Sequence, residues 1–232
     1  MRGDTITREQ LSRMIDHTNL QPYAEYKDFD VLCREAKENH CAMVAINSYP
    51  VPYCKKILEG SEVHVGAAIS FPLGQMSVEA KLYEAADAIE RGADEIDYVL
   101  NISELKNQNI EYIREEMCKM TEICHKKNAL IKVIFENCYL TPNEIIAAAE
   151  AAADIRPDYI KTSTGFGKWG ARVQDVKLMK EVVKDKVKIK AAGGIRSWET
   201  CKQMINAGAE RIGTSSTLKI LEEYDLEHHL SV

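Results

Sequence analysis

The chain has 232 residues, 45% of them hydrophobic, and a formal net charge of −6 at pH 7. This length suits one α/β barrel domain with a sizeable core, and the acidic balance gives no reason to expect nucleic acid or an anionic membrane as a partner. No apolar run is long enough to span a bilayer, and the first residues lack the apolar core of a signal peptide. We therefore expect a cytoplasmic protein.

Apolar periodicity and capping residues divide the chain into alternating helices and strands. A capping-box spacing at residues 7–10 predicts a short N-terminal helix. The expected strands cover residues 14–18, 41–47, 63–71, 95–100, 130–136, 187–192 and 211–214, with a further short strand that opens the stretch 158–167 and ends in a glycine-rich turn. The expected helices lie at about residues 27–39, 50–58, 77–89, 103–127, 141–153 and 175–184, and begin at Ser197 and Ser215 for the last two.

Eight strands alternating with eight helices predict an α/β fold with a parallel sheet. Eight repeats favour a closed (β/α)8 TIM barrel, and no composition shift divides residues 1–232 into more than one domain. A doubly wound open sheet is the alternative. It would need a phosphate-binding turn after its first strand, and none is visible there.

The seven cysteines form no recognisable pattern. Their number is odd and no C-x-x-C pair occurs, which argues against both a disulfide framework and a zinc site. We expect reduced cysteines that pack in the interior, as in a reducing compartment, and no bound metal.

Charged residues stand near the carboxyl ends of the expected strands, where barrels gather their functional groups. Lys161 ends an apolar strand, although lysine is rarely buried without a partner. A buried lysine loses its charge readily and becomes a nucleophile, so we expect Lys161 to attack a carbonyl substrate. The charged residues at strand ends are Asp16, Asp97, Lys132, Glu136, Lys161 and Lys190.

A neighbouring cation would favour this chemistry. Lys161 and Lys190 are one βα unit apart, so they lie on adjacent strands about 4.8 Å from each other. A free lysine is a neutral amine in only about one molecule in 2,500 at pH 7. A nearby Lys190 and partial burial would both lower its pKa, and Asp97 could take or relay protons. The alternative is a buried ion-pair network that only helps to close the barrel.

Two glycine-rich turns after the last two strands have the composition of a phosphate site. Backbone amides in such turns and at helix N-termini bind phosphate, and this is the usual position of phosphate in a barrel. An arginine can add a bidentate contact. The alternative is ordinary loop glycines beside serine caps. The turn residues concerned are Gly193, Gly194, Arg196, Gly213, Ser215 and Ser216.

Seven short motifs follow one another over nearly the whole chain. They are Asp-His-Thr at 16–18, Phe-Pro-Leu-Gly at 71–74, Gly-Ala-Asp-Glu-Ile-Asp at 92–97, Lys-Val-Ile at 132–134, Lys-Thr-Ser-Thr-Gly-Phe at 161–166, Lys-Ala-Ala-Gly-Gly-Ile-Arg at 190–196 and Arg-Ile-Gly-Thr-Ser-Ser at 211–216. Together they resemble the 2-deoxyribose-5-phosphate aldolase family. The resemblance implies a metal-free class I aldolase on a (β/α)8 barrel. It would split 2-deoxy-D-ribose 5-phosphate into acetaldehyde and glyceraldehyde 3-phosphate, or join the two, without a cofactor.

The resemblance also implies a role for individual residues. Lys161 would match the Schiff-base lysine, Lys190 the second lysine that lowers its pKa, and Asp97 the aspartate that transfers protons, while Asp16 would support this network. The expected partners are small phosphorylated sugars and aldehydes, together with further copies of the chain in a dimer or tetramer. Residues expected to contact the substrate or its phosphate are Thr18, Thr164, Gly165, Gly193, Gly194, Arg196, Gly213, Ser215 and Ser216.

Some positions depart from the family pattern. Ala45 stands where the family often has cysteine, Asn137 where threonine is common, and Arg172 where threonine is usual. Arg172, with Lys168, would either reach the phosphate or face solvent. Two other functions stay open: a Schiff-base aldolase with another donor or acceptor, and a non-catalytic phosphate-binding barrel. The presence of both lysines and the aspartate at strand ends argues against the second.

Overall fold

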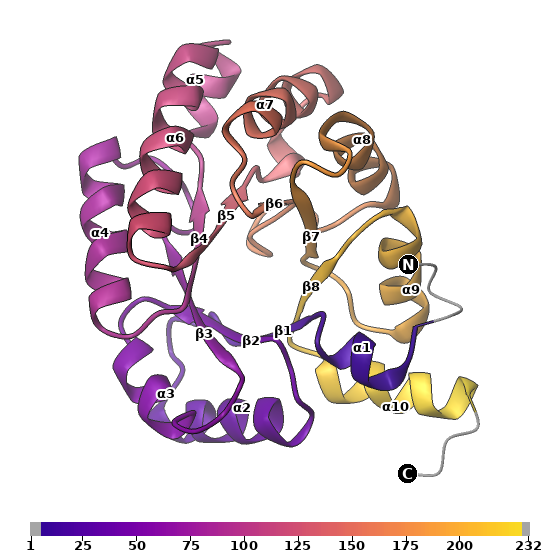
Figure 1. Cartoon of the computed structure of the whole chain (residues 1–232). Helices are drawn as coiled ribbons and strands as arrows, with labels where there is room; N and C mark the ends of the chain where they lie inside the picture. The colour runs from indigo at the N-terminus through magenta and orange to yellow at the C-terminus, as the bar shows by residue number, and fades with distance from the viewer. Residues whose placement is uncertain (1–5, 229–232) are drawn as a thin grey trace.

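The computed structural model describes residues 6–228 and shows a closed barrel of eight parallel strands, ordered β1 to β8 around the ring (Figure 1). The strands are β1 (Ile15–Thr18), β2 (Met43–Asn47), β3 (His64–Ile69), β4 (Glu95–Val99), β5 (Leu130–Ile134), β6 (Tyr159–Lys161), β7 (Lys188–Ala192) and β8 (Arg211–Thr214). β8 pairs with β1, with Ile15 opposite Ile212, and this pairing closes the ring. The predicted (β/α)8 barrel is confirmed, and the open sheet is wrong.

Helices follow the strands and cover the outside of the barrel (Figure 1). A short helix, α1, precedes the barrel as predicted and packs against the last helix, α10. The helices are α1 (Arg8–Ser12), α2 (Tyr26–Glu38), α3 (Val51–Ile57), α4 (Val78–Glu90), α5 (Ile102–Lys106), α6 (Ile110–Lys126), α7 (Pro142–Ile155), α8 (Val173–Val183), α9 (Trp198–Ala207) and α10 (Thr217–Glu227), with a 3-10 turn η2 (Asn137–Tyr139) after β5.

Two helices begin at reciprocal capping boxes, the first of which is the one predicted at residues 7–10. The hydroxyls of Thr7 and Thr141 each accept a hydrogen bond from the amide three residues later. The side chains of Gln10 and Glu144 in turn accept from the amides of the two threonines. Each box satisfies two amides that a helix start would otherwise leave unpaired, and so fixes where α1 and α7 begin.

The single helix predicted over residues 103–127 is wrong, because the structure divides it into α5 and α6. Gln108 lies between them with a left-handed φ of 60°. Asn109 then caps α6, its side-chain oxygen accepting from the Tyr112 amide at 3.3 Å. The polar sequence at 107–109 has the turn and cap chemistry that separates two helices, and the apolar periodicity on either side concealed it.

The strands bury apolar side chains against the helices and charged side chains inside the barrel. Outward residues such as Val44, Ile96, Ile131 and Ile160 are fully buried in the layer between strands and helices. The interior of a barrel is usually filled by branched apolar side chains, whereas here its centre is ionic. The charged side chains inside, each at most 8% exposed, are Asp16, Glu95, Asp97, Lys132, Lys161, Lys190 and Arg211.

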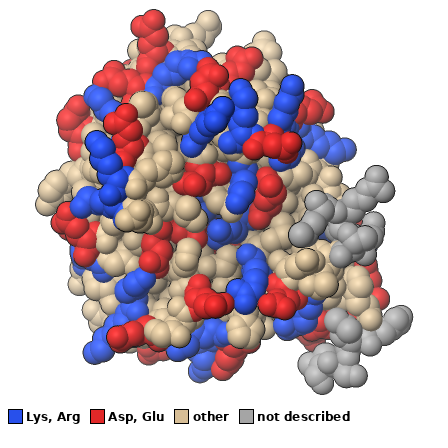
Figure 2. Space-filling model, in the orientation of Figure 1, with Lys and Arg blue, Asp and Glu red and all other residues tan. Residues whose placement is uncertain are grey.

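The surface carries charges of both signs. On the face drawn in Figure 2, Lys and Arg side chains lie among Asp and Glu side chains. Across residues 6–228, no helix is both long and apolar enough to cross a membrane. Within the same range, no three His, Cys, Asp or Glu side chains converge to hold a metal ion. All seven cysteines are free thiols, and six of them are buried.

Outside the barrel, α4 and α6 share a fully buried ion pair. Lys81 Nζ lies 2.5 Å from Glu116 Oε1 and 2.8 Å from the carbonyl oxygen of Val99. The Asn101 amide donates to Glu116 Oε2 at 3.0 Å. Burial lowers the pKa of Lys81 and raises the pKa of Glu116. Each charge therefore depends on its partner.

Lys81→Met is expected to lower the free energy of unfolding by about 3–5 kcal/mol, because it leaves Glu116 buried and unpaired. The double variant Lys81→Met, Glu116→Leu should recover most of this loss, since apolar side chains of similar volume can replace a buried pair. Denaturant unfolding measures both. Lys119→Met, which breaks an exposed pair with Glu115 on α6, is the control and should change little. Equal losses in the single and double variants would contradict the coupling.

Candidate functional site

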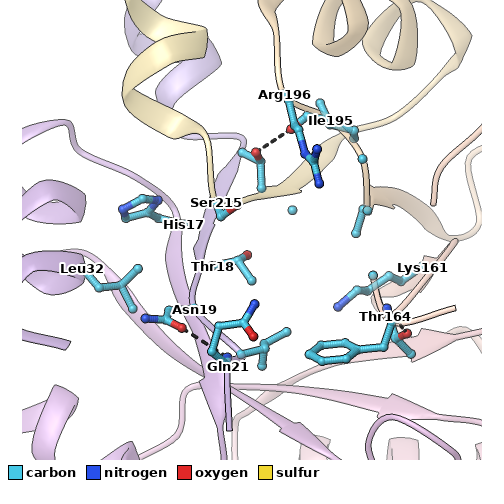
Figure 3. Close-up of a pocket in the computed structure, with 18 of the residues that line it drawn as sticks. His17, Thr18, Asn19, Gln21, Leu32, Lys161, Thr164, Ile195, Arg196 and Ser215 are labelled. Atoms are coloured by element: carbon cyan, nitrogen blue, oxygen red, sulfur yellow. Dashed lines mark hydrogen bonds between the residues drawn. The ribbon is translucent and has the colours of Figure 1, made fainter. Parts of the chain in front are cut away.

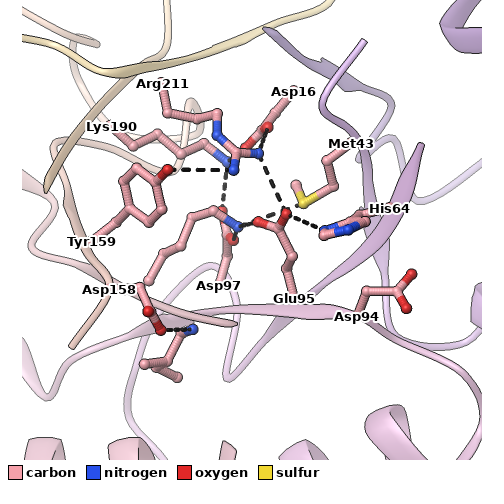
Figure 4. A network of polar contacts seen from close by, with 12 residues as sticks. Asp16, Met43, His64, Asp94, Glu95, Asp97, Asp158, Tyr159, Lys190 and Arg211 are labelled. Atoms are coloured by element: carbon pink, nitrogen blue, oxygen red, sulfur yellow. Dashed lines mark hydrogen bonds and ion pairs between the residues drawn. The ribbon is translucent and has the colours of Figure 1, made fainter. Parts of the chain in front are cut away.

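Asp97 stands at the centre of the charges inside the barrel (Figure 4). Its Oδ2 accepts from Lys161 Nζ at 2.8 Å and from Lys190 Nζ at 2.7 Å, while its Oδ1 accepts from Lys132 Nζ at 2.8 Å. Lys161 and Lys190 are register partners on β6 and β7. The two lysines singled out from the sequence therefore share one carboxylate oxygen, on the same side of the barrel wall.

The network continues toward the amino ends of the strands (Figure 4). Lys190 Nζ lies 2.5 Å from Asp16 Oδ2. Arg211 bridges two carboxylates, with its Nη1 2.7 Å from Asp16 Oδ1 and 3.4 Å from Glu95 Oε1. Lys132 completes the ring by pairing with Glu95. Together with Asp97 and Lys161, these residues form one connected set of ion pairs across six strands, and His64 on β3 joins the set through Glu95.

The paired network is electrically balanced only when Lys161 is neutral. Apart from Lys161, and from the half-exposed imidazole of His64 that lies 2.8 Å from Glu95, its carboxylates and cations are equal in number: Asp16, Glu95 and Asp97 against Lys132, Lys190 and Arg211. A proton on Lys161, which is 3% exposed, adds a buried positive charge that nothing in this set offsets. An uncompensated buried charge is costly, so Lys161 is the group that gives up its proton.

The pKa of Lys161 falls from 10.5 to about 8. Burial is the largest cause, and the positive charges of Lys190 and Lys132 act in the same direction, whereas Asp97 opposes them. Lys132 behaves differently, because the effect of burial is outweighed by the carboxylates of Asp97, Glu95 and Asp16, and its pKa is raised above 10.5. Burial alone would also raise the pKa of Asp97, but the surrounding lysines hold it well below its usual value.

A cavity of about 530 Å³ opens above the network, at the carboxyl ends of the strands (Figure 3). Lys161 projects into it, while Asp16, Asp97 and Lys190 lie beneath, in the network. Ser216 is at the N-cap of α10 and does not line the cavity. The predicted residues that do line it are Thr18, Lys161, Thr164, Gly165, Gly193, Gly194, Arg196, Gly213 and Ser215.

The loops after β6 and β7 meet backbone to backbone at this cavity. Gly165, Gly193 and Gly194 have φ values of 90°, 86° and 76°, which side chains other than glycine rarely adopt. A Cβ atom at Gly170 would lie 2.1 Å from the carbonyl oxygen of Gly193. The amide of Ala171 donates to that same oxygen at 3.0 Å. The two loops are therefore held together by main-chain contacts that leave no space for side chains.

The N-termini of α9 and α10 differ, although both were expected to face a phosphate. At α9, Ser197 caps the helix and the carboxylate of Glu223 accepts from the Trp198 amide at 2.7 Å. At α10, the N-cap residue Ser216 makes no side-chain cap with residues 6–228. The carboxylate of Glu223 would repel an anion at the N-terminus of α9, whereas the uncapped amides at the N-terminus of α10 could bind one.

Among residues 6–228, several amides on the cavity wall have no acceptor, including three in the turns after β7 and β8. The N–H groups of Gly193, Gly194 and Ser215 donate no hydrogen bond to any of residues 6–228. Arg196 belongs to the same loop as the two glycines, and its exposed side chain extends over the cavity (Figure 3). Free amides beside a guanidinium are suited to an anionic ligand.

Thr164 is held in place by Glu136, which follows β5. The Thr164 amide lies 3.3 Å from each carboxylate oxygen, and its hydroxyl donates to Oε2. Glu136 has a left-handed φ of 56°, and burial raises the pKa of its carboxyl group. Phe166, two residues on, packs edge-on against Phe71 with 5.5 Å between ring centroids. The carboxylate of Glu136, one of the charged residues predicted at strand ends, therefore holds the loop beside Lys161 in place.

The residues that depart from the family pattern are placed as follows. The Arg172 guanidinium lies 3.9 Å from the ring centroid of Trp169, and Lys168 Nζ lies 5.7 Å from that of Tyr139. Neither cation lines the cavity that holds Lys161. Ala45 is opposite Thr18 in the β1–β2 register, so its methyl group faces the barrel interior at the level of the cavity.

Several residues of the site were missed in the sequence. Glu95 stands two positions before Asp97, and Arg211 is the register partner of Lys190. The period-two alternation of strands would have placed Glu95 on the inner face. His17, Asn19 and others on the cavity wall carried no such signal, because a single polar residue near a strand end is as common in a loop as in a site. The further lining residues are His17, Asn19, Leu20, Gln21, Asp28, Val31, Leu32, Glu35, Phe166, Ala192, Ile195 and Thr214.

Comparison with known proteins extends over most of the chain. The sequence model of DeoC/LacD family aldolases matches residues 9–222. The deoxyribose-phosphate aldolase of Lactobacillus acidophilus is 51% identical over 216 residues, which cover 93% of this chain and 91% of that protein. The deoxyribose-phosphate aldolase of Thermococcus kodakarensis is 45% identical over 219 residues, 94% of this chain and 98% of that protein.

A solved structure shows the same arrangement of the backbone. The deoxyribose phosphate aldolase of Aeropyrum pernix, described as a unique tetrameric structure, superposes with a TM-score of 0.88 at 30% identity. The superposition covers 94% of this chain and 92% of that one. The likeness therefore includes the whole barrel.

The opposite pKa shifts of two buried lysines predict opposite effects on stability. The folded-state pKa of Lys161, about 8, lies below its ordinary value of 10.5, so the unfolded chain holds this proton more tightly. Stability is lowered fully below pH 8 and recovers as the pH rises toward 10.5. Lys161→Met should therefore raise the free energy of unfolding by about 1–3 kcal/mol at pH 7 and lose this gain above pH 10.5.

Lys132→Met is the matched control. It removes a cation from Asp97 and Glu95 and should lower the free energy of unfolding by about 3–5 kcal/mol at pH 7. Denaturant titrations at pH 7 and pH 10.5 compare the two variants. A Lys161→Met protein as unstable as Lys132→Met would contradict the assignment of Lys161 as the lysine without a counter-charge.

Proposed function

This chain belongs to the DeoC/LacD family of aldolases, and from this premise we propose that it is a deoxyribose-phosphate aldolase. It reversibly cleaves 2-deoxy-D-ribose 5-phosphate to acetaldehyde and D-glyceraldehyde 3-phosphate through a lysine Schiff base. The observation that carries the assignment is the amine of Lys161, which faces a cavity and shares one oxygen of Asp97 with Lys190. The curated relatives described above carry this activity in their names.

Cleavage begins when neutral Lys161 attacks the aldehyde carbon C1 of the open-chain sugar. The nitrogen lone pair forms the C–N bond, the carbonyl oxygen takes one proton from solvent and one from the amine, and loss of water leaves a protonated imine. Asp97 Oδ2, 2.8 Å from Nζ, accepts the N–H proton and returns it to the departing hydroxyl through a water. Because the pKa of Asp97 is held low, this carboxylate passes the proton on rather than retaining it.

The carbon–carbon bond then breaks with the imine as the electron sink. A water relayed to Asp97 removes the proton from the C3 hydroxyl, and C3 becomes the aldehyde of glyceraldehyde 3-phosphate. The electron pair of the C2–C3 bond moves into the protonated imine and leaves an enamine on Lys161. Protonation of the enamine at C2 and hydrolysis release acetaldehyde and restore the amine. Because the protonated imine takes up the electrons, these steps need no metal or organic cofactor.

The opposite wall of the cavity binds the phosphate. The free amides of Gly193, Gly194 and Ser215 and the guanidinium of Arg196 form this end. Anchoring the phosphate there holds C1 against Lys161 and turns the attack into a reaction between positioned groups. Thr18, Thr164, Gly165 and Gly213 line the space between and contact the sugar, while Ser216 supports the turn at α10.

Beyond the reaction, we infer a homo-oligomer of single-domain barrels in the cytoplasm. The tetrameric relative from Aeropyrum pernix supports the assembly. Seven free thiols support a reducing compartment. Size-exclusion chromatography with light scattering tests the assembly, and a monomer at micromolar concentration would overturn it.

Borohydride reduction in the presence of acetaldehyde is expected to attach two carbons to Lys161 alone, as peptide mass mapping would show. Trapping should decline about tenfold per pH unit below pH 8, because the free amine becomes scarce there. Lys161→Leu should abolish both the adduct and the release of triose phosphate from 2-deoxyribose 5-phosphate. An adduct without triose release would indicate an aldolase for another acceptor, and no adduct would indicate a non-catalytic barrel.

Ala45 predicts resistance to unsaturated aldehydes, which inactivate thiols by conjugate addition. Its methyl group faces the barrel interior at the height of Thr18, and a methyl group cannot add to an unsaturated aldehyde. After incubation with an unsaturated aldehyde, this enzyme should retain more activity than its Ala45→Cys variant. The Ala45→Ser variant is the control for the added polar group. Equal losses in wild type and Ala45→Cys would contradict the prediction.

A further inference from the structure

Three side chains from distant parts of the chain meet behind the phosphate end of the cavity. His17 Nε2 lies 2.9 Å from Glu35 Oε2, and His17 Nδ1 lies 2.7 Å from Thr217 Oγ1. His17 and Thr217 are buried, and the Glu35 side chain is only 24% exposed. They come from β1, α2 and the first position of α10, so the contact joins three elements that are remote in sequence.

The chemistry of the three groups fixes the direction of both hydrogen bonds. An ionised carboxylate only accepts, so Nε2 of His17 carries a hydrogen and donates it to Glu35. Burial lowers the pKa of His17, which keeps the ring neutral and leaves Nδ1 as an acceptor. The hydroxyl of Thr217 therefore donates to Nδ1. Glu35 thus selects the tautomer of His17 whose Nδ1 can accept a hydrogen bond from the Thr217 hydroxyl.

Thr217 is tied directly to the turn that bears the phosphate amides. It begins α10 two residues after Ser215, which lines the cavity. On the other side, the Ser216 amide donates to Thr214 Oγ1 at 2.9 Å, and this hydroxyl donates to the Ile195 carbonyl at 2.7 Å. The turn is thus held by His17 at one end and by the β7–α9 loop at the other.

We propose that His17, oriented by Glu35, is a positioning residue for the phosphoryl group: it fixes the first turn of α10 relative to the glycine turn at 193–194. The inference rests on the proposed function. His17 lies on the side of the cavity away from Lys161 (Figure 3), and Glu35, which also lines the cavity, is bound to His17. The pair therefore acts on the phosphate end of the substrate and not on the reacting carbon. His17 also binds the carboxylate of Glu35, which would otherwise face an anion directly.

Thr217→Val tests this with the smallest change, because it removes one hydroxyl and keeps the shape. We expect KM for 2-deoxyribose 5-phosphate to rise about tenfold, since displaced positioning groups reduce binding of the anchored part, with kcat within about twofold. KM for unphosphorylated 2-deoxyribose should stay the same. Thr217→Ser retains the hydroxyl and should behave like the wild type. A rise in KM for both sugars, or for neither, would overturn the proposal.

Two further variants keep the result interpretable. Thr121→Val removes another buried threonine hydroxyl, which donates to the Met117 carbonyl on α6 at 2.7 Å, and should leave both KM values unchanged. His17→Phe breaks both hydrogen bonds and should raise KM for the phosphorylated sugar at least as much as Thr217→Val. An unaltered KM in a folded His17→Phe protein would refute the positioning role.

Acetaldehyde carries no phosphate, so borohydride trapping tests the aldolase chemistry of Lys161 separately from the positioning role of His17. If wild type and Thr217→Val trap acetaldehyde on Lys161 equally but differ in KM for the phosphorylated sugar, both proposals stand. Equal trapping and equal KM would overturn only the role of His17. Absence of trapping in the wild type would overturn the aldolase itself, and the positioning role with it.

Discussion

One carboxylate oxygen, Oδ2 of Asp97, receives two lysine amines at 2.7 and 2.8 Å. Two ammonium groups at such distances from one oxygen repel each other, and the rest of the ion-paired set offers no spare negative charge. The repulsion is relieved when one amine is neutral, and Lys161 is the one that faces the cavity. The arrangement therefore prepares a nucleophile without any group that has to remove its proton at the moment of attack.

Strand register is what turns this sequence into that geometry. Asp97 is opposite Lys132, and Lys161 is opposite Lys190, so all four point inward together. A slip of one residue in β6 would turn Lys161 outward into the apolar layer. The helices prevent such a slip because the outward positions, such as Ile160, are fully buried against them. The packing of the outer layer thus specifies the chemistry of the inner one.

The sequence was most informative where signals are local. Alternating strands and helices, the capping boxes and the two glycine turns depend on neighbouring residues, and they predicted the barrel and the part of the cavity wall formed by these turns and by Lys161. Hydrogen-bond partners that are remote in sequence could not be predicted. Glu223 accepts from the first amide of α9 across 25 residues, and Thr217 is bonded to His17 across 200 residues. Only tertiary packing brings such pairs together, and for His17 and Thr217 it is the pairing of β8 with β1. Propensity and spacing therefore could not reveal them.

The main-chain contact between Gly170 and Gly193 has a consequence for redesign. Because these loops touch without intervening side chains, they cannot be exchanged independently. A loop grafted after β6 that lacks Gly170 would displace the glycine turn at 193–194. Selection for new aldehyde acceptors is better directed at wall positions such as Asn19 and Gln21, whose side chains line the cavity from the segment after β1 and belong to neither loop. Side chains on the cavity wall can therefore change one at a time, whereas a change in the backbone of one loop requires a matching change in the other.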